Sequence, residues 1–401
     1  MKPLEGIKIV EIANFVAAPA SSRLLADWGA EVIKIEAPGG DPNRFMGTLN
    51  RMPGEDGANP TFDTTAMNKK LISLDLKKAE AKAILFRLLE EADAVLTNFR
   101  TDALKKMGLT YEILSERFPR LIFAQILGYG EAGSEKDTPG YDYTAYGARG
   151  GLIGSLHQAG GEPINAITAY GDFQASITLA AGILGAYIGR QKTGMGEKVT
   201  VSLHHTAVYM FNWAIMAAAF GNHYPKNRRS VNCPTINTYQ GSNGRWMQLC
   251  VPEYDRYYSK FITLIGRGDL AKDERFDKIA TLTRLGTNGE LIAIIEEKMK
   301  EKTVDEWVAI FKENQLPCEK AYEFEEILKD EQAWENDILQ KMKYPTGDEV
   351  TIVRTPVLMK NMGLPESRAS GAIGRDTAEV LKRHGYTPEE IKGFRAGGII
   401  K

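Results

Sequence analysis

The first third of the chain alternates between short runs rich in Ile, Val and Leu and longer segments with helical spacing of apolar residues. Such runs suit strands that are covered on both faces, and a helix between two of them makes a parallel crossover. The expected strands are 7–12, 31–36, 71–76, 92–99 and 121–129, and the expected helices are 19–28, 82–92 and 102–118. The pattern therefore predicts an α/β fold with a doubly wound parallel sheet.

The turn after the first expected strand reads ANFVAAPAS (13–21). It lacks the G-x-G-x-x-G pattern that cradles the pyrophosphate of NAD or FAD, so a plain dinucleotide dehydrogenase is disfavoured. The chain also contains no HExxH, no cluster of Cys and His, and no GxxxxGK[ST]. The motifs that usually bind a metal ion or a nucleoside triphosphate are therefore absent, and we expect no metal site.

The charges are balanced, with 50 basic and 52 acidic residues. There is no net field to attract nucleic acid or an anionic membrane, and neither is expected as a partner. The N-terminus lacks the pattern of a signal peptide, so we expect a cytoplasmic protein whose three separated cysteines are reduced structural thiols. Two apolar segments, 173–189 and 205–221, are short and rich in Ala and Gly, which favours buried helices over membrane spans.

The texture of the sequence changes twice after the alternating region. A glycine- and tyrosine-rich stretch begins at about Gly128, and long ordered loops of this kind are commonly functional. Farther on, QGSNGR (240–245) separates two strand-like runs and predicts a hairpin in a new domain. We expect a large domain at 1–200, a linker at 201–226, a smaller α+β domain at 227–335 and a C-terminal return to the large domain at 336–401.

Asp172 is the residue that attracts most interest, because it follows a glycine and precedes a long apolar helix. Aspartate is common at the N-cap of helices, which is a purely structural reason for its presence. The same position also has chemical use, since a helix N-terminus favours an ionised carboxylate and offers free N–H groups to developing negative charge. The two interpretations are compatible.

Several stretches together resemble the class III CoA-transferase family, whose members include formyl-CoA transferase, carnitine CoA-transferase and α-methylacyl-CoA racemase. The main ones are GIKIVEIANFVAAPASS (6–22), NKKLISLDLKK (68–78), NFRTDALKKMGLTYE (98–112), YGDFQASITLAAG (170–182) and IGRDTAEVLKRHGYTPEEI (373–391). The resemblance extends over nearly the whole chain. It implies that Asp172 attacks an acyl-CoA thioester, with CoA thioesters as substrates and no permanently bound cofactor. It also implies a homodimer of interlocked chains.

The resemblance also implies a CoA site, carried over residue by residue to Phe15, Val16, Ala17, Leu74, Lys77, Asn98, Phe99 and Lys106. Lysines suit a ligand with three phosphate groups, although either lysine alone could be an ordinary surface charge. Ala37 stands where family members often carry Arg. The stretch SVNCPTINTYQ (230–240) lacks the run of glycines that covers the site in formyl-CoA transferase, which disfavours formyl or oxalyl specificity.

Two other functions stay open at this point. A racemase on the same fold uses an aspartate and a histidine, but Tyr141 stands where that histidine falls, and the pKa of a tyrosine is ordinarily about 10. A catalytically silent CoA-binding protein is the other alternative. Within the transferases, the sequence resembles the branch that acts on (R)-2-hydroxy acids such as 2-hydroxyisocaproate or phenyllactate. Tyr141 and Tyr143 are the candidate partners of the substrate hydroxyl, and the apolar stretch 208–220 is either a wall for its side chain or ordinary packing.

Overall fold

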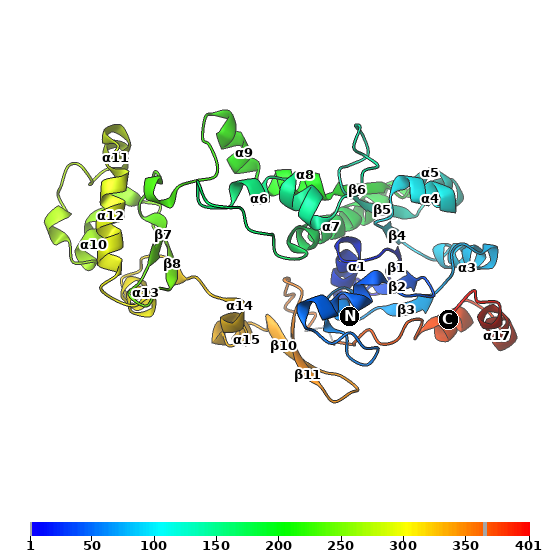
Figure 1. The fold of residues 1–401 in the computed structure, drawn as a ribbon. Coiled ribbons are helices and arrows are strands. Elements are labelled where there is room, and N and C mark those ends of the chain that lie inside the picture. The colour runs from blue at the N-terminus through cyan, green and yellow to red at the C-terminus, as the bar shows by residue number, and fades with distance from the viewer. Residues whose placement is uncertain (1, 364–366) are drawn as a thin grey trace. The chain divides into compact units, whose positions relative to one another are not determined.

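The computed structural model describes residues 2–363 and 367–401, which form two compact units (Figure 1). The first unit consists of Met1–Leu152, Asn165–Met216 and Glu331–Lys401, and the second of Ile153–Ile164 and Ala217–Asp330. Residues 153–164 therefore cluster with the second unit, although the sequence placed them inside the large domain. Our domain limits stay a prediction, and each unit is described by itself.

The first unit is built on a parallel sheet of six strands in the order β3-β2-β1-β4-β5-β6. The strands are β1 (Lys8–Ile12), β2 (Glu31–Glu36), β3 (Lys70–Ser73), β4 (Ala94–Thr97), β5 (Ile122–Leu127) and β6 (Lys198–Ser202). Four of them, β1, β2, β4 and β5, fall within the apolar runs that the sequence marked, and β3 overlaps the run 71–76. From β1 the chain adds β2 and β3 on one side of the sheet, and then returns to add β4, β5 and β6 on the other side. The strand order therefore reverses between β1 and β4, which is where open α/β sheets bind ligands.

Helices cover both faces of this sheet, which confirms the doubly wound α/β prediction. On one face, side chains of α1 (Ala17–Asp27) and α7 (Tyr170–Thr193) pack against the strands in one apolar core. On the other face lies a second core that includes side chains of α3 (Ala79–Leu89), α4 (Thr101–Met107) and α5 (Tyr111–Arg117). The expected helix at 102–118 is thus two helices, because Gly108 ends α4 with a φ of 70°.

The C-terminal return completes the edge of the sheet at β3. It contributes the hairpin of β10 (Leu339–Lys343) and β11 (Glu349–Val353), followed by α16 (Thr377–Arg383) and α17 (Pro388–Ala396). Asp376 accepts a hydrogen bond from the backbone of Leu71 at 2.8 Å, and Thr377 accepts one from Ser73 at 3.1 Å. Figure 1 shows these last, red segments beside the light blue β3.

The second unit has its own apolar core and a three-stranded antiparallel sheet, β7-β8-β9. Its strands are β7 (Ile236–Gln240), β8 (Trp246–Cys250) and β9 (Cys318–Lys320), and its main helices are α10 (Tyr254–Leu264), α11 (Ile279–Leu285), α12 (Asn288–Met299) and α13 (Val304–Glu313). β7 and β8 pair across QGSNGR, so the predicted hairpin is confirmed. This unit is an α+β assembly, as expected from the sequence.

The two apolar segments that were expected to be buried helices are only partly buried. α7 buries one face, but Phe173 is 41% and Ile177 is 48% exposed. The second segment forms α8 (Leu203–Met210) and α9 (Asn212–Ala219), and no residue of α9 is buried. In the described part of the chain, no helix has the length and apolar character needed to cross a membrane.

Candidate active site

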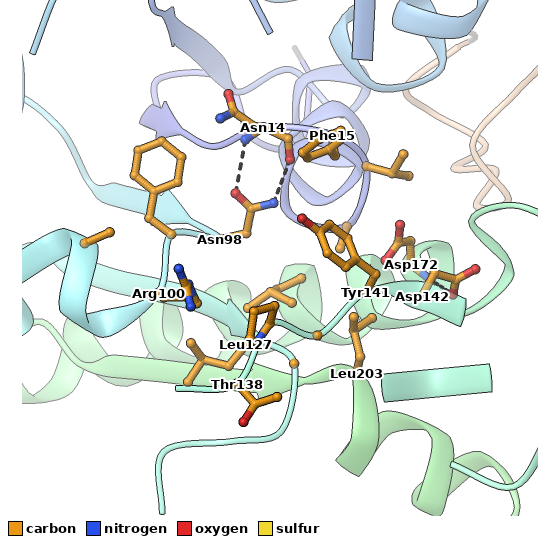
Figure 2. Close-up of a pocket in the computed structure, with 18 of the residues that line it drawn as sticks. Asn14, Phe15, Asn98, Arg100, Leu127, Thr138, Tyr141, Asp142, Asp172 and Leu203 are labelled. Atoms are coloured by element: carbon orange, nitrogen blue, oxygen red, sulfur yellow. Dashed lines mark hydrogen bonds between the residues drawn. The ribbon is translucent and has the colours of Figure 1, made fainter. Parts of the chain in front are cut away.

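A cavity of about 350 Å³ opens at the carboxyl ends of β1 and β4, where the strand order reverses. Its lining comes from the turn after β1, the segment after β4, the loop after β5 and the start of α7 (Figure 2). Asn98 holds the turn after β1 in place. Its side chain accepts from the backbone N–H of Asn14 at 3.1 Å and donates to the Asn14 carbonyl at 2.6 Å. The two strand ends at the reversal are thereby tied together.

The structure brings seven of the eleven predicted site residues together around this cavity. These are Phe15, Val16, Ala17, Asn98, Phe99, Tyr141 and Asp172. The rings of Phe15 and Tyr141 meet edge to face, with centroids 6.2 Å apart. The turn after β1 and the tyrosine-rich stretch, which are far apart in the sequence, therefore form one wall.

The other four predicted residues lie outside the cavity lining. Leu74 is buried in the core between the sheet and its helices, while Lys77 and Lys106 are exposed. Tyr143 is half-buried, and its hydroxyl shares a 2.7 Å hydrogen bond with the hydroxyl of Thr168. The apolar stretch 208–220 contributes nothing to the lining either, so a wall, one of its two possible roles, is not part of this cavity.

Two basic residues that sequence reasoning missed do line the cavity. Arg100 follows β4, where it donates to the carbonyl of Asp137 at 3.1 Å, and Lys136 belongs to the loop after β5. Both side chains are exposed at this edge of the first unit. Basic residues are common on protein surfaces, so only their position at the strand ends distinguishes them from others.

Asp172 is the third residue of α7 and lies in its first turn, so it is not the N-cap that its sequence context suggested. The N-cap is Ala169, a non-glycine residue with a φ of 64° and no side chain that can accept a hydrogen bond. The free N–H groups of this helix end are instead bound by Asp142. Its Oδ1 accepts from the backbone of Gly171 at 2.7 Å and of Asp172 at 3.1 Å.

Asp142 reaches this place because it begins a short π-helix, Asp142–Ala148. Short π-helical turns are rare in proteins, and those that occur often lie at functional sites. Tyr146 of the same turn packs directly on the start of α7, since a Cβ added to Gly171 would lie 2.1 Å from the Tyr146 Cγ atom. Figure 2 shows Tyr141, Asp142 and Asp172 among the residues that line the cavity.

The surroundings of Asp172 favour its neutral form. Burial and the nearby carboxylate of Asp142 raise the pKa of Asp172 from its ordinary 3.8 to about 7. Burial also raises the pKa of Asp142, although the backbone N–H groups that it binds act in the opposite direction. A carboxyl group with a strongly raised pKa inside a cavity is a candidate for chemistry.

No group of His, Cys, Asp and Glu within residues 2–363 and 367–401 is arranged to hold a metal ion. The polar groups that face the cavity are instead two carboxyl groups, a phenol, amides and two cations, of which the carboxyl groups come from Asp142 and Asp172. The arrangement can bind an anionic ligand at its basic side and present a carboxylate to it.

Residues 4–377 match CoA-transferase family III, and the chain belongs to that family. It is a family III CoA-transferase, as its resemblance implied.

The similarity to individual relatives extends over almost the whole chain. It is 49% identical over 390 residues to cinnamoyl-CoA:phenyllactate CoA-transferase of Clostridium sporogenes, covering 96% of this chain and 94% of the relative. It is 44% identical over 398 residues to (R)-2-hydroxy-4-methylpentanoate CoA-transferase of Clostridioides difficile, covering 99% of both. The crystal structure of a CAIB/BAIF family protein from Brucella suis matches with a TM-score of 0.81 and 28% identity, over 96% of this chain and 99% of that one.

Proposed function

We propose that this enzyme transfers CoA from an acyl-CoA donor to an (R)-2-hydroxy acid with a branched aliphatic or aromatic side chain, using Asp172 as a covalent nucleophile. The relatives named above act on phenyllactate and 2-hydroxy-4-methylpentanoate by name, which supports this substrate class. The observation that carries the mechanism is the carboxyl group of Asp172, which lies at the cavity with its pKa raised to about 7.

The first half of the reaction takes the acyl group off CoA. A carboxylate oxygen of Asp172 attacks the thioester carbonyl, the C–S bond breaks, and an acyl-aspartyl anhydride and CoA thiolate result. The thiolate then attacks the Cγ atom of Asp172, which releases the donor as a carboxylate and leaves an aspartyl-CoA thioester. Covalent catalysis divides the exchange into two easier steps.

The second half runs the same steps in reverse with the acceptor. The carboxylate of the 2-hydroxy acid attacks Cγ of the aspartyl thioester, so that an anhydride forms and the thiolate leaves again. The thiolate attacks the acceptor's acyl carbon, giving the new acyl-CoA and the free carboxylate of Asp172. Atoms and charge balance with no other reactant.

The CoA moiety is held along the turn Phe15–Ala17 and the segment after β4, where Asn98 and Phe99 lie. Arg100 and Lys136 are placed to bind its phosphate groups, since both line the same cavity. Lys77 and Lys106 contribute only where the nucleotide end extends beyond the cavity. Tyr141 is the candidate partner of the acceptor's hydroxyl group. Tyr143 lies outside the cavity lining and supports Tyr141 in this role. The large domain at 1–200 with the return at 336–401 carries this chemistry, in a cytoplasmic homodimer.

The test of the nucleophile is the variant Asp172→Asn, which keeps the shape of the side chain but cannot form the anhydride. We expect CoA transfer to fall by about 10⁴-fold or more, as when other acting nucleophiles are removed. Hydroxylamine should inactivate the wild-type enzyme only in the presence of acyl-CoA, with the modification on the peptide that contains Asp172. Substantial transfer by purified, folded Asp172→Asn is incompatible with the proposal.

The test of the substrate class compares 2-hydroxyisocaproate, phenyllactate, lactate, carnitine and oxalate as acceptors from one acyl-CoA donor. We expect the highest kcat/KM for one of the first two. Oxalate has no hydroxyl group for the site to bind, carnitine has its hydroxyl group on C3 instead of C2, and lactate lacks the large apolar side chain. A maximum for oxalate or carnitine would contradict the substrate class and leave the mechanism standing. Inversion of an α-carbon without transfer would indicate the racemase.

A further inference from the structure

Four charged side chains lie close to the turn after β1, and none of them lines the cavity. We call them the buried charge network: Glu11, Lys34, Asp41 and Lys69, each with no exposed side-chain surface. Lys34 Nζ lies 2.7 Å from both Glu11 Oε1 and Asp41 Oδ2, and Lys69 Nζ lies 2.6 Å from Glu11 Oε2. Two cations and two anions thus compensate one another.

Charge compensation alone does not explain this network. Removing four ions from water costs several kcal/mol for each, and well-packed apolar residues often stabilise a fold as well or better. Ser22 donates one further hydrogen bond to Glu11, and the Asn43 N–H donates one to Asp41. What distinguishes the network is that three other hydrogen bonds go to one stretch of backbone. Lys34 donates to the Ala13 carbonyl at 2.8 Å, Lys69 donates to the Pro19 carbonyl at 2.7 Å, and Asp41 accepts from the Phe15 N–H at 2.9 Å.

All three hydrogen bonds end on the backbone of the turn or of the first residues of α1. Phe15 itself has a φ of 61°, a left-handed conformation that few residues other than glycine adopt. Such a conformation persists only when the surroundings hold it in place. Asp41 accepts a hydrogen bond from the N–H of Phe15. Asn98 in turn binds both polar backbone atoms of Asn14 (Figure 2).

We infer that Asp41, oriented by Lys34, is a positioning residue for CoA-ester binding: it holds the Phe15 turn in its left-handed conformation and thereby shapes the cavity wall. Asp41 touches no ligand in this arrangement and acts only through the turn. The inference rests on the proposed function in one respect, namely that the cavity binds the CoA ester. The geometry of the turn itself does not depend on that.

Asp41→Ala removes the acceptor of the Phe15 N–H, and also that of the Asn43 N–H, and leaves Lys34 paired with Glu11. We expect the KM for acyl-CoA and the Kd for free coenzyme A to rise by about 10-fold or more, the equivalent of one charge-assisted hydrogen bond, with kcat changed much less. Asp41→Asn keeps an oxygen for the Phe15 N–H, so it should lie between wild type and Asp41→Ala. It is also the variant to measure if Asp41→Ala does not fold.

The matched control is Asp27→Ala, which breaks another buried ion pair, with Arg23 at 2.9 Å, away from the turn. It should lower the melting temperature without raising the KM for acyl-CoA. Hydrogen exchange of the amide of Phe15 gives a measurement that needs no ligand, and it should accelerate in Asp41→Ala but not in Asp27→Ala.

Two results would overturn the inference. One is a folded Asp41→Ala that keeps the wild-type KM and Phe15 exchange rate, and the other is an equal rise in KM for Asp27→Ala. If the wild-type enzyme binds no coenzyme A at all, the proposed function fails. The exchange of the Phe15 amide then still decides whether Asp41 holds the turn.

Discussion

At the scale of single residues, the raised pKa of Asp172 has two opposite consequences for transfer. A carboxylate with a higher pKa is more basic and so a stronger nucleophile, but less of it is ionised at a given pH. With a pKa of about 7, roughly half of the enzyme is in the reactive form at neutral pH. The neighbouring carboxylate of Asp142 contributes to this balance.

The pH dependence of transfer follows from this balance. Because the ionised form of Asp172 attacks, kcat/KM should rise with pH and level off above about 7. Asp142→Asn removes a nearby negative charge, so the rise should move to lower pH. Asp102→Asn on exposed surface is the control and should leave the profile unchanged. A wild-type profile that is flat between about pH 5 and 8 would contradict the assignment of the pKa.

Stability should depend on pH in the opposite sense. The folded-state pKa of Asp172 is raised above its ordinary value of 3.8, so the native state loses stability relative to the unfolded state as pH rises from about 4 to 7. Asp172→Asn carries no charge at any pH. Its unfolding free energy should therefore exceed that of wild type by about 1–3 kcal/mol at pH 8 and be close to that of wild type at pH 4. Calorimetry at the two pH values checks this, and an equal difference at both would refute it.

Sequence reasoning identified Asp172 but not Asp142, and the reason is physical. A carboxylate that caps a helix from 30 residues away leaves no local pattern, unlike a residue that caps its own helix. The signal that could have found it is its place between Tyr141 and Tyr143, which were both singled out. Lys77 and Lys106 were chosen on resemblance alone, and their distance from the cavity lining became visible only with the fold.

At the scale of elements, the close packing at the start of α7 is the feature that sets the position of the nucleophile. Gly171→Ala should lower stability by about 1–3 kcal/mol, as overpacking does, and should slow transfer because Asp172 is displaced. Gly185→Ala in the same helix meets no neighbour within 4 Å and is the matched control. It should be neutral or stabilising by up to about 1 kcal/mol, since alanine favours helices. Equal effects of the two substitutions would show that packing on Tyr146 is unimportant.

Elements with a strong periodic pattern could be predicted from the sequence, and those defined by tertiary contacts could not. The strands β1, β2, β4 and β5 follow from runs of Ile, Val and Leu that suit burial on both faces. The π-helix Asp142–Ala148 has no such pattern, because its hydrogen bonds to α7 and the packing of Tyr146 determine where it forms.

At the scale of the whole molecule, large apolar side chains of α8 and α9 are exposed on a single chain. Tyr209 is 67%, Trp213 85% and Met216 63% exposed. Exposed apolar surface of this kind marks protein interfaces, and the homodimer that we propose would cover it. Trp213→Glu should therefore shift the protein from dimer toward monomer in analytical ultracentrifugation, while Ile113→Glu on α5 should not. A wild-type protein that is monomeric at micromolar concentration would contradict the prediction.

The edge of the main sheet at β3 is closed by residues from the other end of the chain. The hydrogen bond between Leu71 and Asp376 joins positions 305 residues apart. During synthesis, β3 leaves the ribosome long before Asp376 and Thr377 exist, so its outer backbone groups lack these partners while the intervening residues are made. An unpaired strand edge is a place where other chains can add. The nascent chain therefore depends on the segment that contains Asp376 and Thr377, or on a chaperone in the meantime, to protect the domain that carries Asp172.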